Sequence, residues 1–210
     1  MLLKMGEYLQ THRAEFLLQV WDHLRISLYA LLAASVIGII CGYFGSRSKK
    51  SERIVSLPFE VLRVVPSLAI LVLLIPIMGT GVKSAVVALT ILAVPPILLN
   101  TIVGFREVPD FVLESARGIG MNDRESLFRV QFPLAMPMIL AGMRTALVEV
   151  IASATLAAKI GAGGLGEIIF TGLGLNRADL LLIGGLSVGI LSLGAGFLFD
   201  VITRRILRWK

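Results

Sequence analysis

Four apolar runs without a charged residue limit what this chain can fold into. They cover 26–46, 64–82, 84–105 and 180–199. A helix of about 20 apolar residues spans the hydrocarbon core of a bilayer. Of the 210 residues, 56% are hydrophobic and 16% charged, whereas soluble domains carry about 25% charged residues. The sequence therefore predicts one all-α integral membrane domain over 1–210, with a transmembrane core at 24–205.

A fifth span is expected at 136–160, although Arg144 and Glu149 make it less apolar. Clusters of Lys and Arg follow the first, third and last uncharged runs. Cytoplasmic loops collect such residues, so all three clusters belong inside, and two spans must separate the second cluster from the third. The sequence thus predicts five transmembrane helices, with the N-terminus outside and the C-terminus inside. This topology accounts for the net charge of +6, and we expect no nucleic-acid binding. The clusters are Arg47, Lys49, Lys50 and Arg53, then Arg106, Arg117, Arg124 and Arg129, then Arg204, Arg205, Arg208 and Lys210.

The segment 1–23, before the first span, has mixed charge and lacks the pattern of a cleavable signal peptide. Apolar side chains within 5–23, from Tyr8 to Trp21, can gather on one side of a helix. We therefore expect a short amphipathic helix at the outer interface, followed by a first span that serves as the insertion signal.

Small residues at four-residue spacing form a ridge along the first span, at Ala30, Ala34, Gly38 and Gly42. Such a ridge lets another helix approach closely, so we expect tight helix packing on this face.

Prolines interrupt the middle of the chain, at Pro66, Pro76, Pro95 and Pro96. Proline removes a backbone hydrogen bond from a helix, which predicts kinked or discontinuous helices at these positions.

A polar, charged segment follows the third span. Pro109 and Asp110 suit the first turn of a helix, which we expect to run to about Arg117. Gly118 and Gly120 then allow a sharp turn.

Asn122 and Glu125 have the spacing of a capping box that opens a second helix, which is expected to stop before Pro133. The range 106–133 is therefore predicted to be a cytoplasmic helix–turn–helix, which we call the elbow. Its apolar side chains would be unexplained on a free loop and suggest a groove in a partner. They are Leu127, Phe128 and Val130.

The elbow resembles a loop in the permeases of ATP-binding-cassette (ABC) importers, written E-A-A-x-x-x-G, nine residues, then I-x-L-P. Here Glu114-Ser115-Ala116 is followed by Gly120 and, nine residues later, by 130–133, which reads VQFP. The resemblance implies the fold of a type I importer permease, similar to the methionine permeases, and a coupling helix that sits in a cleft of an ATPase. The residues it assigns to coupling are Glu114, Ser115, Ala116, Arg117, Gly118, Gly120, Met121 and Pro133.

The stretches 66–71, 133–146 and 154–173 look like the subset of these permeases that imports glycine betaine, carnitine or choline. Two alternatives remain open, a permease for methionine or another small zwitterion, and a membrane structural or receptor subunit without a pathway. The chain is only 7% aromatic, and trimethylammonium groups are commonly held in aromatic cages. We therefore expect specificity to reside in a separate binding protein.

The resemblance also implies the partners. They are a second permease chain, identical or different, two cytoplasmic ATPase subunits, an extracytoplasmic solute-binding protein and the lipid of a bacterial plasma membrane. The chain has no G-x-x-x-x-G-K-[ST] loop, so ATP and Mg²⁺ are expected on the ATPase, with no cofactor, no metal and no enzymatic site in this chain.

A glycine-rich segment at Gly161, Gly163, Gly164 and Gly166 matches G-x-G-x-x-G in form. A dinucleotide site needs a preceding strand, and here a membrane span precedes the segment. It is predicted to be an outer segment near the gate, or else a flexible turn, with 167–175 as a short re-entrant piece.

Glu149 and Arg144 are ionisable groups within a predicted span, and such groups usually have a function. We expect Glu149 and Arg144 to line the pathway or to contact the second subunit. The alternative is a residue that stays hydrated near an inner cavity.

Overall fold

The computed structural model describes residues 2–207, with side chains from residue 5 onward, and every regular element in that part is helical. The predicted all-α membrane fold is confirmed. A π-helix (Leu127–Gln131) precedes α8, and a 3₁₀-helix (Ala158–Ile160) follows it. The α-helices are α1 (Leu2–Thr11), α2 (Arg13–Ser46), α3 (Lys49–Val64), α4 (Ser67–Met78), α5 (Val82–Arg106), α6 (Asp110–Gly118), α7 (Asp123–Ser126), α8 (Phe132–Ala157), α9 (Gly166–Gly174) and α10 (Ala178–Ile206).

Four helical segments of the described chain are long and apolar enough to cross a membrane. They are α2, α5, α10 and the continuous helical stretch Asp123–Ile160 that contains α8. The pair α3 and α4 makes a fifth span if the two are counted together, although they are bent by 101°. The predicted number of five therefore depends on this bent pair.

The span predicted at 64–82 is wrong as a single helix. Val65 and Pro66 adopt extended backbone angles, which end α3 at Val64 and start α4 at Ser67. Since Pro66 cannot donate a backbone hydrogen bond and disfavours helical geometry in the residue before it, the chain turns here. The helix that leads to this turn begins at Lys49, inside the first basic cluster.

The N-terminal segment also differs from the prediction. The helix expected at 5–23 is divided at His12, which separates α1 from α2. The residues from Arg13 to His23 belong to α2 and continue into the first span without a break.

The ridge of small residues on α2 packs against α5 in the same chain. Ala30 and Ala34 are fully buried, and a Cβ atom on Gly42 would lie 2.5 Å from the Cβ of Thr101. The ridge is therefore occupied within the chain.

Helix α5 lies at the centre of the bundle and continues without interruption through Pro95 and Pro96, both of them buried. The expected discontinuity is confirmed at Pro66 but is absent from α5 and, at Pro76, from α4.

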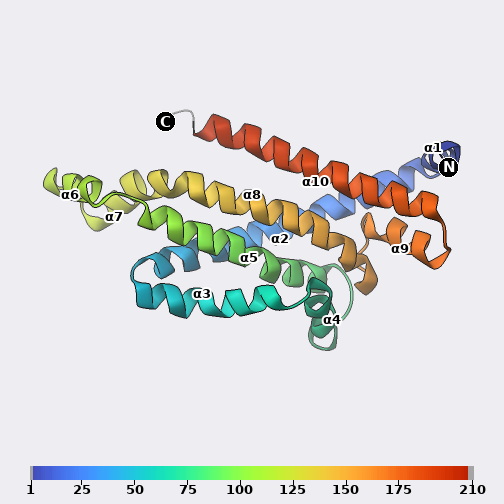
Figure 1. Ribbon diagram of the computed structural model, residues 1–210, viewed down its shortest axis with the longest axis horizontal. Helices are drawn as coiled ribbons and strands as arrows, with labels where there is room; N and C mark the ends of the chain where they lie inside the picture. Colours follow the sequence, from blue (N-terminus) through green and yellow to red (C-terminus); the bar gives the residue numbers. More distant parts are fainter. Residues whose placement is uncertain (1, 208–210) are drawn as a thin grey trace.

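The bundle has two distinct ends (Figure 1). The elbow lies at one end, and α1 and α9 lie at the other. At the elbow end, Arg106 forms an ion pair with Glu52, and its Nε donates to the Ser46 carbonyl oxygen at 3.3 Å. The structure thus brings the first basic cluster beside the start of the second.

Candidate functional site

The first arm of the elbow is α6, which begins after Pro109 with Asp110 in its first turn. A carboxylate at this position favours the helix, because the N-terminus of a helix carries a partial positive charge. Ala116 is buried, whereas Glu114 is exposed and forms no hydrogen bond or ion pair with another described residue. Glu114 is therefore available to a partner rather than held inside the elbow.

The turn after α6 is a Schellman motif centred on Gly120. The Met121 amide donates to the Ala116 carbonyl at 3.1 Å, and the Gly120 amide donates to the Arg117 carbonyl at 2.9 Å. This pair of bonds requires a left-handed residue between them, and Gly120 has φ +84°. Gly118, by contrast, is the last residue of α6 and needs no unusual angle. The turn thus depends on one glycine.

The second arm starts with the capping box that the sequence predicts. The Asn122 side chain accepts from the Glu125 amide at 2.9 Å, and the Asn122 amide donates to the Glu125 carboxylate at 3.1 Å. The predicted end of this arm before Pro133 is wrong, because helical structure continues from α7 through the π-helix into α8. Pro133 lies in the first turn of α8, where a missing amide proton costs little.

Three large apolar side chains of the elbow are exposed, and we call them the elbow patch. They are Phe111 (69% exposed), Ile119 (75%) and Phe128 (61%). Of the three residues expected on this surface, only Phe128 is strongly exposed. Leu127 and Val130 are half-buried. Leu127 packs against the cluster that contains Phe105.

The opposite end of the bundle carries the glycine-rich segment. Gly161, Gly163 and Gly164 all have positive φ. A Cβ atom on Gly164 would lie 3.1 Å from the Nδ1 atom of His23, and one on Gly166 only 2.0 Å from the Thr155 carbonyl oxygen. The segment is therefore closely packed on α2 and α8. The predicted re-entrant piece corresponds to α9.

His23 connects α2 to α8 in this region through a buried hydrogen bond that the sequence did not predict. Its ring is 1% exposed, and its Nε2 atom lies 2.9 Å from the Ile151 carbonyl oxygen on α8. Since a carbonyl only accepts, Nε2 carries the proton. One turn earlier on α2, Gln19 donates to Glu167 of α9 at 3.3 Å.

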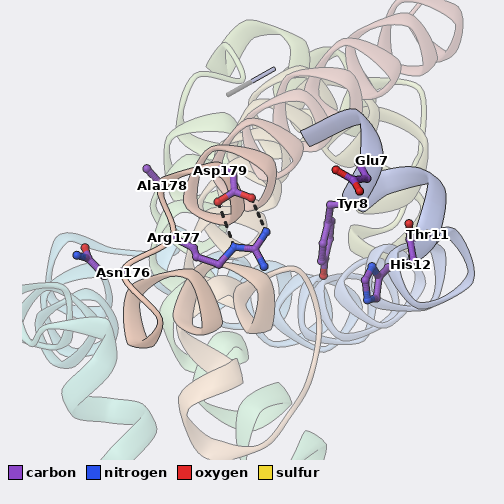
Figure 2. Close-up of a pocket in the computed structure, with 8 residues that line it drawn as sticks. All are labelled: Glu7, Tyr8, Thr11, His12, Asn176, Arg177, Ala178 and Asp179. Atoms are coloured by element: carbon purple, nitrogen blue, oxygen red, sulfur yellow. Dashed lines mark hydrogen bonds and ion pairs between the residues drawn. The ribbon is translucent and has the colours of Figure 1, made fainter. Parts of the chain in front are cut away.

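A cavity of about 770 Å³ opens at this same end, between α1 and the start of α10 (Figure 2). Arg177 donates two hydrogen bonds to the Asp179 carboxylate, from Nη2 to Oδ2 at 2.5 Å and from Nε to Oδ1 at 3.3 Å. The hydrogen bond to Asp179 raises the pKa of Arg177. On the α1 side, the rings of Tyr8 and His12 stack at 4.5 Å, and burial, followed by the charge of Glu15, raises the pKa of Tyr8.

The structure does not bring Arg144 and Glu149 together. Arg144 pairs with Asp200 on α10. Glu149 is half-buried and lines a second cavity, of about 230 Å³, whose wall also contains Arg63. Neither the Arg144–Asp200 pair nor the cavity shared by Glu149 and Arg63 could have been inferred from sequence spacing.

The described residues contain no group of three or more His, Cys, Asp or Glu side chains that could hold a metal ion.

A bundle of membrane-spanning helices that presents a capped elbow at one end defines a class of proteins, the permease components of importers. The chain belongs to the family of binding-protein-dependent transport system inner membrane components, whose model matches residues 34–209. The family membership expected from the elbow is confirmed, and so is the prediction of a multi-pass inner membrane protein that acts as a transporter component.

Two relatives and one solved structure show the breadth of the similarity. The carnitine transport permease protein OpuCB of Listeria monocytogenes is 44% identical over 190 residues, which cover 90% of this chain and 87% of that protein. The glycine betaine/carnitine/choline transport system permease protein OpuCB of Bacillus subtilis is 39% identical over 203 residues, covering 97% and 94%. An inward-facing structure of the MetNI methionine ABC transporter matches with a TM-score of 0.82 and 25% identity, covering 91% of this chain and 95% of that one.

Proposed function

We propose that this chain forms the membrane pathway of an ATP-driven, binding-protein-dependent importer for quaternary-ammonium osmoprotectants. The observation that carries this proposal is the 44% identity to a carnitine permease over nearly the full length of both proteins. Glycine betaine, carnitine and choline, the solutes in the names of its relatives, share a trimethylammonium group.

The whole of 1–210 acts as one permease domain in this proposal, and two copies, or this chain and a related one, enclose the pathway. The elbow faces the cytoplasm and binds one of two ATPase subunits, which carry ATP and Mg²⁺. The outer end, with α1, α9 and the glycine-rich segment as gate, receives a solute-binding protein. Support for this orientation comes from the basic residues near Arg47 and Arg106, which share the elbow end of the bundle, as the positive-inside rule requires.

Accessibility of introduced cysteines tests the orientation. The chain has a single cysteine, Cys41, which is first replaced by alanine. A membrane-impermeant maleimide added to intact cells should then label Asn176→Cys but not Ser115→Cys, and lysis should reverse the protection of Ser115→Cys. Labelling of Ser115→Cys in intact cells would overturn the proposed topology.

Uptake into proteoliposomes tests the transport function. The chain is reconstituted with its ATPase and binding protein, and uptake of labelled glycine betaine, carnitine and choline is followed with and without internal ATP. ATP-dependent uptake supports the proposal. Uptake of methionine alone would favour the second candidate, which the similarity to the methionine transporter structure suggests. Failure to transport any solute would favour a subunit without a pathway.

A further inference from the structure

The cavity lined by Glu149 lies where α3 turns into α4, beside residues that are exposed in this chain, such as Val64. Its wall combines this turn with parts of α5 and α8. At 1.5 Å per residue, Pro95 is about 20 Å from the start of α5 and about 16 Å from its end. The cavity is therefore within the depth of the hydrocarbon core, where an ionisable side chain is costly unless it has a function.

Two opposite charges share this cavity without neutralising one another. Arg63 belongs to the end of α3 and Glu149 to α8, and both side chains line the cavity. No ion pair within 4.0 Å joins them or connects Glu149 to any other described residue. The cavity thus has a positive side and a negative side with space between them.

The part of α5 that lines this cavity includes Pro95, which is followed by Pro96. Pro95 and Pro96 have no amide proton to donate to the carbonyl groups one turn earlier. Those carbonyls belong to Ile91 and Leu92, which line the cavity. Helix α5 continues through both buried prolines. The carbonyl oxygens of Ile91 and Leu92 nevertheless lack the amide donors that a helix normally supplies.

The size of the cavity restricts its occupant. Pockets for drug-sized ligands measure about 300–1,000 Å³, and this one is about 230 Å³. A small solute fits. No aromatic side chain among the described residues lines the cavity, so a cation there would be attracted by the Glu149 carboxylate instead of an aromatic cage.

We propose that this cavity is a solute site within the permease, in which Glu149 attracts the quaternary ammonium group and Arg63 binds the carboxylate of a small betaine. The inference rests on the proposed function and adds to it a second point of selection, beyond the binding protein. Choline has the ammonium group but no carboxylate, so it depends on Glu149 alone.

Binding to the assembled permease–ATPase complex, without the binding protein, tests this site. Labelled glycine betaine and labelled choline are measured by scintillation proximity. Glu149→Gln should weaken both by about tenfold or more, because Arg63 is left as an unopposed positive charge. Arg63→Gln should weaken glycine betaine by about fivefold and leave choline unchanged or tighter, because the repelling cation is removed.

Two variants on α3 serve as controls, Arg53→Gln and Glu60→Gln, since neither residue lines this cavity. Both should bind the two solutes as the unmodified complex does. Thermal unfolding is measured for all four variants to detect a folding defect, and basal ATP hydrolysis of the two control variants should stay unchanged.

The outcomes separate this inference from the proposed function. If the unmodified complex transports betaines but binds none without the binding protein at millimolar concentration, the site is wrong and the function stands. Equal losses of choline and glycine betaine in Arg63→Gln would also overturn the site, because they would indicate a structural ion pair. If no betaine is transported or bound, the proposed function itself fails.

Discussion

The Nε atom of Arg144 lies 2.6 Å from the Oδ1 atom of Asp200, and this ion pair joins α8 to α10. Both side chains are partly exposed on the surface of the bundle. Both residues lie within membrane-spanning helices, where a charge without a partner is costly. Each charge of the pair therefore compensates the other.

Replacing one residue of this pair should destabilise the protein more than replacing both. Asp200→Asn leaves Arg144 unpaired, and we expect a loss of about 1 kcal/mol, or roughly 2–4 °C in Tm. The double variant Arg144→Gln with Asp200→Asn should recover part of this loss. Thermal unfolding in detergent measures the effect, and strictly additive losses would show that the contact contributes nothing.

The same substitution should have opposite effects on stability at two glycines, because only one of them lies in the close packing of α2 on α5. Gly42→Ala would place a methyl group 2.5 Å from the Thr101 Cβ atom and should cost about 1–3 kcal/mol. Gly189→Ala on α10 meets nothing within 4 Å and should be neutral or stabilising by up to about 1 kcal/mol. Tm values of the two variants, compared directly, check the difference; a tolerated Gly42→Ala would contradict the close approach.

Substitutions at Gly120 separate backbone geometry from charge at the elbow. A Cβ atom there meets nothing within 4 Å, so the cost comes from the positive φ, which Asn and Asp tolerate better than β-branched residues. Gly120→Asn should retain most coupling, and Gly120→Val should lose most of it. Gly120→Asp should remain inserted but lose solute-stimulated ATP hydrolysis through its charge. Full coupling in both Gly120→Val and Gly120→Asp would sink the assignment of this turn to the ATPase interface.

The elbow patch should supply affinity for the ATPase. Phe128→Ser removes one of its three exposed apolar side chains and should weaken co-purification of the ATPase by about tenfold, as loss of a central interface aromatic does. Phe44→Ser is a matched control, because Phe44 is 59% exposed at the end of α2. Equal retention of the ATPase by the two variants would show that Phe128 lies outside the interface.

Local signals in the elbow were sufficient to predict its first arm and turn. Proline at the start of α6, the positive φ of Gly120 and the Asn122–Glu125 box are each determined by neighbouring residues. The second arm could not be delimited in this way. Pro133 reads as a stop signal, yet a proline is tolerated in a first helical turn, and packing extends the helix past it.

Hydropathy located the uncharged runs but not the backbone within them. The run at 64–82 contains the turn at Pro66, and its helix starts at Lys49 among charged residues that a hydropathy count rejects. Arg63 of α3 and Glu149 of α8 line one cavity although they are far apart in the sequence. Only the folded arrangement brings them together.

Helical structure continues without a gap from Asp123 in the elbow to Ile160 beside the glycine-rich segment, a rod of about 57 Å at 1.5 Å per residue. A tilt imposed on such a rod at the elbow reappears at its far end without a chain of intermediate contacts. A π-helical turn at Leu127–Gln131 interrupts its regular α-helical hydrogen bonding, and Pro137 lies farther along it. Stiffening the π-helical turn would therefore change how much of a small displacement of the elbow reaches the glycine-rich segment, even if every residue of that segment were left intact.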